Sequence, residues 1–348
     1  MKTHRMAVIG VGSLGQHHAS KLAGFDDVDL VAVVDPGVEQ VEAVASKNNT
    51  QAMTSIFELP ADLDGVIIAT PTIYHLETAR HFLKQGIATF VEKPLAVNVD
   101  EAQQLLDAAS QGGAMMQVGH IERFNPAFQL AAERVGKPLY IRSQRVSPYT
   151  FRSTDIGVVH DLMIHDIDLA LALTGETPVS VDAFGAVGIG PNEDMAVARF
   201  KMPSGCVVDI TSSRMAPVPE RNLQVWSDTG CVSANLHTRQ VTSWKASSPF
   251  LANPGMVHSI AAATADPRTL KDSVFGEWIE TETVEGDSCD QMSLELRDFV
   301  DSMANGIQPT VTGEEALKAM QVAEQVVGCL NLWSYQEQEQ TTVARPAA

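Results

Sequence analysis

The chain has 348 residues, of which 45% are hydrophobic and 19% are charged, and its formal net charge is −19 at pH 7. This length favours two domains, and the composition is typical of a globular protein rather than a disordered or fibrous one. The acidic balance argues against nucleic acid or an anionic membrane as a partner, and no apolar run reaches membrane-spanning length.

The N-terminal segment MKTHRMAVIG leads directly into a strand-like run, so we expect no signal peptide. The four cysteines (Cys206, Cys231, Cys289 and Cys329) lack CxxC spacing, which argues against a zinc site or a disulfide framework. Reduced thiols are normal in the cytoplasm. We therefore expect a cytoplasmic protein without a structural metal.

Strand-like and helix-like segments alternate over residues 1–120. Apolar, β-branched runs lie at residues 6–12, 28–35, 65–71, 88–94 and 114–120, with amphipathic stretches between them. Continuous apolar strands separated by helices indicate a parallel sheet that is covered on both faces. We expect a doubly wound α/β domain over residues 1–120.

The first turn of this domain, GVGSLG, places Gly10, Gly12 and Gly15 between a strand and a helix. Gly10 permits the tight turn, Gly12 lets a pyrophosphate approach the backbone, and Gly15 allows the helix to pack closely on the strand. Ser13 and Leu14 complete the turn. Asp35 ends the second strand, where a carboxylate binds ribose hydroxyls. No arginine follows Asp35 to accept a 2′-phosphate. The pattern predicts a Rossmann domain that binds NAD rather than NADP.

Two further strands end in polar motifs at the edge of the sheet where ligands bind in such folds. Thr70 and Pro71 end the fourth strand, with His75 in the following helix, and Glu92, Lys93 and Pro94 end the fifth. We expect Thr70, Pro71, His75, Glu92 and Lys93 to bind the cofactor. A surface lysine beside a turn would give the same local pattern, and the isomer of the Lys93–Pro94 bond is open.

The pattern changes near residue 120. A helix over residues 125–136 and a strand over 138–146 precede five short strand-like runs with tight turns, at residues 179–188, 194–202, 205–214, 222–230 and 231–237. These predict an α+β domain with a large, mostly antiparallel open sheet over residues 121–335. We expect a long loop over 246–278, closing helices over 290–306 and 313–333, and a polar tail over 336–348. The uncovered sheet face favours a homo-oligomer.

Residues 158–173 combine apolar richness with a narrow polar stripe. In an α-helix, Asp161, His165 and Asp168 fall within roughly 60° of one another, while apolar side chains cover the remaining circumference. Such a helix either lines a ligand cleft or exposes its acids to water. Asp166 is expected to have a structural role, and a structural hydrogen bond is also the expected role of Asp168.

The GxGxxG turn, the EKP motif and the Asp-x-x-x-His helix, in this order, resemble the Gfo/Idh/MocA oxidoreductase family, and the resemblance spans nearly the whole chain. It implies an NAD-dependent enzyme that oxidises or reduces a hydroxyl carbon of a sugar, cyclitol or related compound. It also implies that Lys93, Asp161 and His165 are catalytic, with His165 accepting the hydroxyl proton. Lys93 would donate a hydrogen bond to the reacting oxygen.

Within the family, residues 118–128 and 155–171 are most similar to the UDP-N-acetylglucosamine 3-dehydrogenase branch, which prepares a 3-amino sugar for lipid A. The resemblance implies a diphosphate ligand, for which Arg123, Arg142, Arg145 and Arg152 are candidates, although each arginine can instead pair with an acid. Substrate contacts are expected from Arg123, Asn125, Tyr149, Arg152, Asp161 and His165, with Phe151 beside Tyr149.

Three alternatives remain open. A dehydrogenase of a free sugar or inositol would share the same motifs. A metal-dependent hydrolase or isomerase would use Asp161, His165 and Asp168 as ligands, which the nucleotide-binding pattern argues against. A non-catalytic NAD sensor would have no need of Lys93, Asp161 and His165 together.

Overall fold

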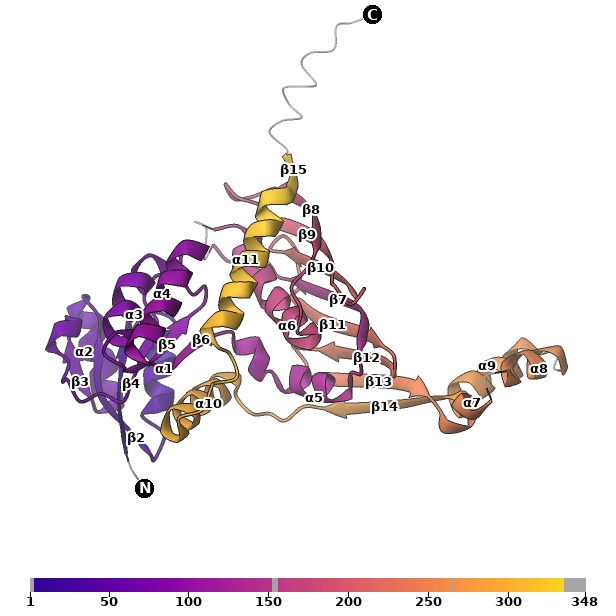
Figure 1. Cartoon of the computed structure of the whole chain (residues 1–348), viewed down its shortest axis with the longest axis horizontal. Coiled ribbons are helices and arrows are strands. Elements are labelled where there is room, and N and C mark those ends of the chain that lie inside the picture. The colour runs from indigo at the N-terminus through magenta and orange to yellow at the C-terminus, as the bar shows by residue number, and fades with distance from the viewer. Residues whose placement is uncertain (1–2, 152–155, 254, 264–265, 335–348) are drawn as a thin grey trace, which may run out of the picture. The chain divides into compact units, whose positions relative to one another are not determined.

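The computed structural model describes residues 3–151, 156–253, 255–263 and 266–334, and the chain divides into two compact units (Figure 1). Unit 1 comprises Met1–Phe124 and Cys289–Gln321, and unit 2 comprises Asn125–Ser288 and Val322–Ala348. Within the described ranges, no helix has both the length and the apolar character needed to cross a membrane.

Unit 1 contains a six-stranded parallel sheet in the order β3-β2-β1-β4-β5-β6. The strands are β1 (His4–Ile9), β2 (Val28–Val34), β3 (Gln51–Met53), β4 (Gly65–Ile68), β5 (Ala88–Glu92) and β6 (Met116–Gly119). The order reverses between β1 and β4, which places a ligand crevice at the carboxyl ends of these strands. The predicted doubly wound Rossmann domain is confirmed.

Helices connect these parallel strands. They are α1 (Gly15–Leu22), α2 (Val38–Asn48), α3 (His75–Leu83) and α4 (Val99–Gly112), with short helices η1 (Ile56–Glu58), η2 (Thr72–Tyr74) and η3 (Ile121–Phe124). Local sequence sets several ends. Asn98 caps α4 by accepting a hydrogen bond from the backbone N–H of Glu101 at 2.8 Å, and Gly113 ends α4 in the left-handed conformation, with φ 65°.

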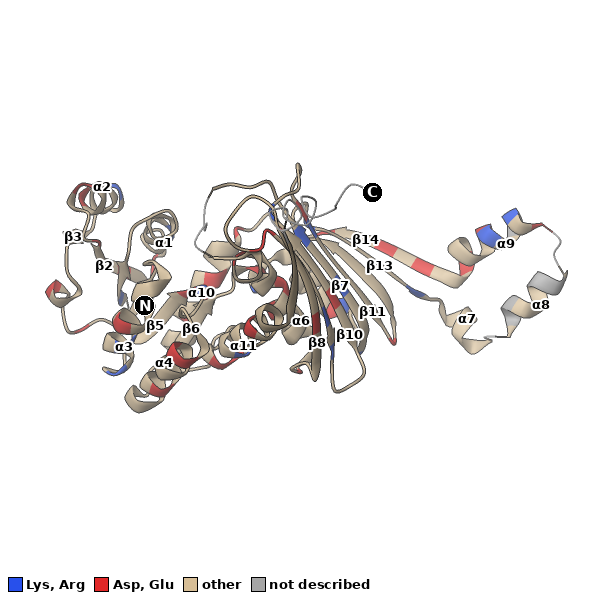
Figure 2. Ribbon diagram, turned by 90° about the horizontal axis from the view of Figure 1, so that it is seen from above, with Lys and Arg blue, Asp and Glu red and all other residues tan. Residues whose placement is uncertain are grey.

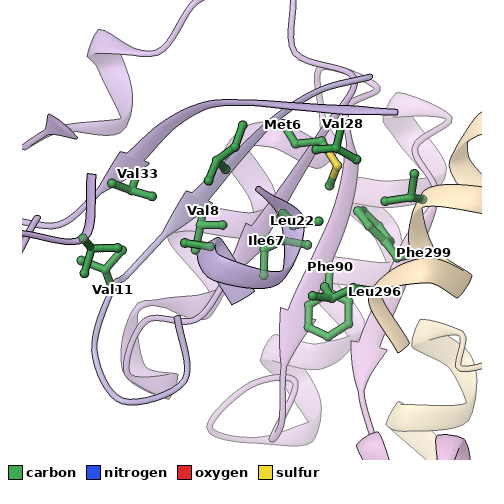
Figure 3. Close-up of a cluster of buried hydrophobic side chains, with 14 of the residues drawn as sticks. Met6, Val8, Val11, Leu22, Val28, Val33, Ile67, Phe90, Leu296 and Phe299 are labelled. Atoms are coloured by element: carbon green, nitrogen blue, oxygen red, sulfur yellow. The ribbon is translucent and has the colours of Figure 1, made fainter. Parts of the chain in front are cut away.

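Helix α10 (Gln291–Asn305) belongs to unit 1, although the sequence placed it in the second domain. Leu296, Phe299 and Val300 lie three and four residues apart on one face of α10, and all are fully buried. Figure 3 shows Phe299 against the core of the six-stranded sheet, where its ring lies 5.9 Å from that of Phe90 in an edge-to-face arrangement. Burial of this apolar face, rather than proximity in sequence, decides which unit holds α10.

Unit 2 contains a nine-stranded sheet in the order β14-β13-β12-β11-β7-β10-β9-β8-β15 (Figure 1). Figure 2 shows the same sheet from above, with β7, β8, β10, β11, β13 and β14 labelled. The strands are β7 (Pro138–Val146), β8 (Ser180–Val187), β9 (Met195–Lys201), β10 (Val207–Ser213), β11 (Glu220–Ser227), β12 (Gly230–Asn235), β13 (Gln240–Ala246), β14 (Ile279–Glu285) and β15 (Leu330–Ser334). Among the described strands of this nine-stranded sheet, only the β7–β10 and β8–β15 pairs are parallel. The predicted mostly antiparallel sheet is confirmed.

The prediction of a long loop over residues 246–278 is wrong. This segment forms α7 (Ser248–Ala252), α8 (Met256–Ala263), α9 (Pro267–Ser273) and the π-helical η5 (Val274–Trp278) between two paired strands, β13 and β14. Pro267 and the capping Asp266, whose carboxylate accepts the N–H of Arg268 at 3.1 Å, favour a helix start inside a stretch that the Pro and Gly content had marked as irregular.

The closing helix is also shorter than expected. Helix α11 (Gly313–Cys329) ends four residues before Trp333, because Leu330–Ser334 forms the edge strand β15 beside β8. The remaining helices of unit 2 are α5 (Pro126–Arg134), the π-helical η4 (Val159–Met163) and α6 (Ile164–Thr174). The tail predicted over residues 336–348 lies outside the described residues.

Candidate functional site

A pocket of about 710 Å³ lies in unit 1 at the carboxyl ends of β1, β2 and β4. Seven of the residues expected to bind the cofactor line it, namely Gly10, Gly12, Ser13, Leu14, Asp35, Thr70 and Pro71. Thr54, Ile56, Tyr74 and Thr78 also line it, and the sequence analysis did not select them. The signal available for Thr54 and Ile56 was their place just after β3, at the ligand-binding edge of the sheet.

The three glycines of the turn meet different constraints. Gly10 has φ 84°, and a Cβ there would lie 2.7 Å from the backbone of Ala69 and Thr70. A Cβ on Gly15 would lie 1.8 Å from the carbonyl oxygen of Gly10. A Cβ on Gly12 would meet nothing within 4 Å, so the protein's own packing does not require glycine there. The space over Gly12 fits a pyrophosphate that approaches the backbone.

Asp35 is held at the rim of this pocket by two backbone amides. Its Oδ2 accepts the N–H of Val11 at 3.0 Å, and its Oδ1 accepts the N–H of Gly37 at 2.9 Å. The carboxylate therefore joins the glycine-rich turn to the start of α2. Each oxygen retains a second lone pair that can accept a ribose hydroxyl.

Thr70 and His75 take different positions at the end of β4. The Thr70 hydroxyl has no hydrogen-bond partner among the described residues, and Thr70 lines the pocket. His75 is 1% exposed, and its expected contact with the cofactor stays a prediction. Its Nε2 lies 2.9 Å from the carbonyl oxygen of Thr70, and its Nδ1 lies 3.0 Å from that of Pro94. Burial lowers the pKa of His75, which favours the neutral imidazole.

The EKP motif ends β5, and the Lys93–Pro94 bond is cis. Lys93 is half-buried. Glu92 is 8% exposed, and its expected contact with the cofactor stays a prediction. Its Oε1 lies 2.6 Å from Nε2 of His18, which is fully buried on α1, and its Oε2 accepts the backbone N–H of Lys93 at 3.1 Å. The sequence analysis missed His18, although it follows the glycine motif by three residues.

The residues of this pocket fit NAD. The open space at Gly12, the amides of the turn at the start of α1, the fixed carboxylate of Asp35 and the unpartnered Thr70 hydroxyl all lie along one pocket. These groups match the pyrophosphate and ribose of a dinucleotide. They also leave no basic side chain among the pocket's residues to neutralise a 2′-phosphate.

The polar helix of unit 2 begins as the π-helical η4 and continues as α6, so the predicted uniform α-helix over residues 158–173 is wrong in its first turn. Asp161 and His165 are half-buried, whereas Asp166 and Asp168 are each only 2% exposed. Of the three residues predicted to form one polar stripe, Asp168 is therefore buried, whereas Asp161 and His165 are partly exposed. π-helical turns are frequent at functional sites, because the extra residue changes which side chains share a face.

Glu193 fixes the start of η4, and the sequence analysis did not find it. The backbone of Glu193 accepts the N–H of Val158 at 2.9 Å, and its Oε1 accepts the N–H of Val159 at 3.2 Å. A Cβ on Gly157 would lie 1.9 Å from this oxygen, so any other residue there would displace the Glu193 carboxylate. These contacts satisfy amides that the first turn of a helix leaves without partners.

Arg145 and Arg142 do not converge on a ligand. Arg145 is 3% exposed, and its Nε donates to Oδ2 of Asp166 at 2.7 Å. Ser143 donates to the other oxygen of Asp166 at 2.6 Å, which gives Asp166 the expected structural role. Arg142 is exposed on the opposite face of β7, because side chains an odd number of residues apart on a strand point to opposite faces.

Two further substrate candidates have partners within their own unit. The guanidinium of Arg123 donates to Oε1 of Glu315 at 2.8 Å, and Glu315 also accepts the N–H of Thr312 at the start of α11. Asn125 is fully buried, accepts the N–H of Ala127 as the cap of α5, and donates to the carbonyl oxygen of Leu236 at 2.9 Å. The expected substrate contacts of Asn125 and Arg123 stay predictions.

Tyr149 is half-buried in the loop after β7. The ring of Phe151, which is 79% exposed, lies 5.0 Å away, and the guanidinium of Arg214 lies 5.1 Å from the Tyr149 ring centre. Arg214 is itself buried and ion-paired with Asp194 at 2.8 Å. Arg152 lies outside the described residues. An aromatic pair beside a buried guanidinium provides a surface for a sugar or a base.

No group of three or more His, Cys, Asp or Glu side chains could hold a metal ion in the part of the chain that the structure describes. Asp161, His165 and Asp168 thus do not form the ligand set that a metal-dependent hydrolase would need.

Comparison with protein families matches residues 4–120 to the NAD-binding Rossmann fold of an oxidoreductase family and residues 129–233 to the GFO/IDH/MocA C-terminal domain. The chain is 38% identical over 226 residues to UDP-N-acetylglucosamine 3-dehydrogenase from Acidithiobacillus ferrooxidans, covering 64% of this chain and 72% of the relative. It is 28% identical over 345 residues to inositol 2-dehydrogenase from Rhizobium meliloti, covering 93% and 96%.

Solved structures agree with these matches. The structure of UDP-N-acetylglucosamine 3-dehydrogenase from Acidithiobacillus ferrooxidans superimposes with a TM-score of 0.83 at 29% identity, covering 95% of this chain and 98% of that chain.

Proposed function

The chain belongs to the Gfo/Idh/MocA family of NAD-dependent oxidoreductases, and we propose that it oxidises the 3-hydroxyl of UDP-N-acetylglucosamine. The family membership makes it a dehydrogenase whose cofactor is NAD and whose substrate is a small molecule. The observation that supports the substrate is the similarity, in sequence and in fold, to UDP-N-acetylglucosamine 3-dehydrogenase. The product would supply a 3-amino sugar for lipid A.

The reaction removes a hydride from the carbon and a proton from its hydroxyl oxygen, which turns a secondary alcohol into a ketone. When bound, NAD accepts the hydrogen and the electron pair that leave the carbon. The hydroxyl proton needs a base, and we assign this role to His165, whose half-buried imidazole lies on α6. Asp161, on η4, is assigned to orient this imidazole or to bind a neighbouring hydroxyl.

Lys93 is assigned to the reacting oxygen. Its ammonium donates a hydrogen bond to the oxygen while negative charge develops there. The residue sits directly after β5, at the edge of the sheet where the pocket also lies. The convergence of Lys93 and His165 on one carbon stays a prediction.

The aromatic pair Tyr149 and Phe151 supports a ligand with a sugar or a base, since the Tyr149 ring lies beside Arg214 and the Phe151 ring lies against Tyr149. Arg145 and Asn125 are buried and have hydrogen-bond partners within unit 2, which gives less support to a substrate contact from either of them. Arg123 and Arg152 remain the candidates for the diphosphate.

A second candidate is oxidation of inositol, because inositol 2-dehydrogenase from Rhizobium meliloti matches more of the chain at lower identity. Cyclitols and nucleotide sugars present similar secondary alcohols to the same catalytic groups. They differ in the diphosphate and uracil, so affinity for UDP alone separates the two proposals.

The test is a substrate screen with the purified protein and NAD, following NADH formation. We expect turnover of UDP-N-acetylglucosamine, weaker turnover of UDP-glucose, and none of glucose or myo-inositol, with UDP as a competitive inhibitor. Mass spectrometry of the product should show the loss of two hydrogens. Turnover of myo-inositol that UDP does not inhibit would overturn the proposed substrate in favour of the second candidate.

We also propose a cytoplasmic homo-oligomer. All four cysteines are free thiols, of which Cys206 and Cys231 are buried, and free thiols suit a reducing compartment. The nine-stranded sheet leaves Phe184 and Trp226 46% and 37% exposed, which favours a second copy as their cover. Light scattering of the purified protein measures its mass in solution.

A further inference from the structure

A buried acid–imidazole pair lies directly behind Lys93 in unit 1. His18 is 0% exposed and Glu92 is 8% exposed, and their nearest side-chain atoms, Nε2 and Oε1, are 2.6 Å apart. The second oxygen of Glu92 accepts the backbone N–H of Lys93 at 3.1 Å. The pair belongs to the β5 terminus and α1, and the roles assigned above do not use it.

We propose that the His18–Glu92 pair is a positioning device for Lys93, which fixes the Lys93 backbone and keeps a negative charge beside its ammonium group. This inference rests on the proposed function, in which Lys93 donates to the reacting oxygen. His18 and Glu92 are positioning residues, because they act through Lys93. A lysine that loses its proton cannot support the developing negative charge.

The surroundings of Glu92 show that it is the charged acid of the site. Burial alone raises the pKa of Glu92, but the hydrogen bond and charge of His18, the N–H of Lys93 and the charge of Lys93 outweigh burial and lower it. Because attraction between two charges is mutual, the carboxylate that gains from the Lys93 charge also favours the ammonium form of Lys93.

Glu295 is a second buried acid in unit 1, and its pKa is shifted in the direction opposite to that of Glu92. It is 1% exposed on α10, and its Oε1 has no hydrogen-bond partner among the described residues. Burial, followed by the charges of Glu92 and Asp298, raises the pKa of Glu295 well above the ordinary value, whereas the pKa of Glu92 is lowered, so Glu92 is the stronger acid of the two. We therefore assign the charge that acts on Lys93 to Glu92 and not to Glu295.

Other titratable groups near Glu92 do not replace its charge. His75, at the start of α3, feels the charge of Glu92, but its burial lowers its pKa and favours the neutral form. The imidazole of His18, on α1, is the group that pairs with the carboxylate of Glu92. Gly119 of β6 gives Glu92 its space, since a Cβ there would lie 2.9 Å from Oε2.

The test compares two buried isosteric changes, Glu92→Gln and Glu295→Gln. The amide of Glu92→Gln can still accept the N–H of Lys93 and donate to a neutral His18, so the hydrogen bonds survive while the charge is lost. We expect the alkaline limb of the kcat/KM profile to move toward lower pH by about 1 pH unit. Glu295→Gln removes no charge, and its profile should match that of the wild type.

A second readout does not depend on turnover. The rate at which an acylating reagent modifies Lys93 follows its neutral amine, and peptide mass spectrometry measures that rate as a function of pH. The midpoint for Lys93 should fall by the same amount in Glu92→Gln and in His18→Phe, which leaves Glu92 uncompensated and protonated. An unchanged midpoint in Glu92→Gln overturns the inference, as does an equal fall in Glu295→Gln.

Failure of the proposed function would look different. Lys93→Ala with wild-type kcat removes Lys93 from the reaction, whatever its acylation midpoint. A strong loss of kcat in Lys93→Ala, combined with an unchanged midpoint of Lys93 acylation in Glu92→Gln, would agree with the proposed function. It would contradict only the positioning role of the His18–Glu92 pair.

Discussion

The carboxylate of Asp35 accepts the backbone N–H of Val11 at 3.0 Å, so the acid that ends β2 is tied directly to the glycine-rich turn after β1. Its other oxygen accepts the N–H of Gly37 at the start of α2. The two segments that should bind the ribose and the pyrophosphate are thereby held in one geometry before any cofactor enters.

Asp35→Asn should weaken NAD binding by roughly tenfold or more, because a charged acceptor of ribose hydroxyls is lost. The change should also relax discrimination against NADP, since the repulsion between a carboxylate and a 2′-phosphate disappears. Titration calorimetry with both cofactors measures the ratio of their Kd values. Glu39→Gln removes an exposed charge from the first turn of α2 and serves as the control. An unchanged ratio in Asp35→Asn would refute the ribose assignment.

Gly12→Ala and Gly15→Ala should separate binding from folding. A methyl group at Gly12 meets nothing within 4 Å, so the variant should fold normally and lose NAD affinity. A methyl group at Gly15 would lie 1.8 Å from the oxygen of Gly10 and should destabilise the fold by roughly 1–3 kcal/mol or more. Urea unfolding without NAD and a cofactor titration give the two quantities. Equal NAD affinity in Gly12→Ala and the wild type would mean that no phosphate lies over Gly12.

His165→Ala should lower kcat by about two to four orders of magnitude, as expected when a general base is removed. NAD affinity should persist, because the groups that line the cofactor pocket all belong to unit 1. His237→Ala, at an exposed position of unit 2, is the control. Steady-state kinetics with the substrate identified in the screen provide the measurement, and near-normal turnover would remove His165 from the mechanism.

Asp194→Asn should destabilise unit 2 by about 3–5 kcal/mol at pH 7, because it leaves the buried guanidinium of Arg214 without its counter-charge. Burial raises the pKa of Asp194, but hydrogen bonds from Ile189, Gly190 and Arg214 outweigh burial and lower it. Since the pKa is lowered on folding, the carboxylate stabilises the fold above its unfolded pKa of about 3.8 and loses this effect as the pH falls through the folded value.

The difference in unfolding free energy between the wild type and Asp194→Asn should therefore shrink between pH 7 and pH 3. Urea unfolding at both values checks this. The double variant Asp194→Asn/Arg214→Met removes both charges and should cost less than the single change at pH 7. A difference in unfolding free energy that stays constant between pH 7 and pH 3 would contradict the assignment of an ionised Asp194.

Patterns that depend on neighbours in sequence predicted much of unit 1. The glycine turn, the acid at the end of β2 and the apolar parallel strands each follow from backbone geometry over a few residues. The same holds for the short strands of unit 2, where alternation and turn residues marked β7 to β12. The placement of α10 did not follow, because its apolar face fits either unit until the cluster around Phe90 and Phe299 is formed.

Side-chain partners were the main source of error at the site. Arg145 and Asn125 had the right chemistry for a substrate, but Asp166 and Leu236 engage them from positions distant in sequence. Glu92 lies at a predicted strand end and His75 begins the helix after another, and yet both side chains are buried. A charge or an amide in a sequence does not reveal whether another segment will satisfy it when both are buried.

The sequence by itself determined the nucleotide-binding turn, the preference for NAD at Asp35 and the order of sheet and helix, because these depend on local backbone conformation and on the period of apolar residues. Only the tertiary structure decided which polar groups face the pocket and which stabilise the interior. His18, Glu92 and Glu295 show the reason: they are 74 and 203 residues apart along the chain, and in the folded interior His18 lowers the pKa of Glu92 while Glu92 raises that of Glu295.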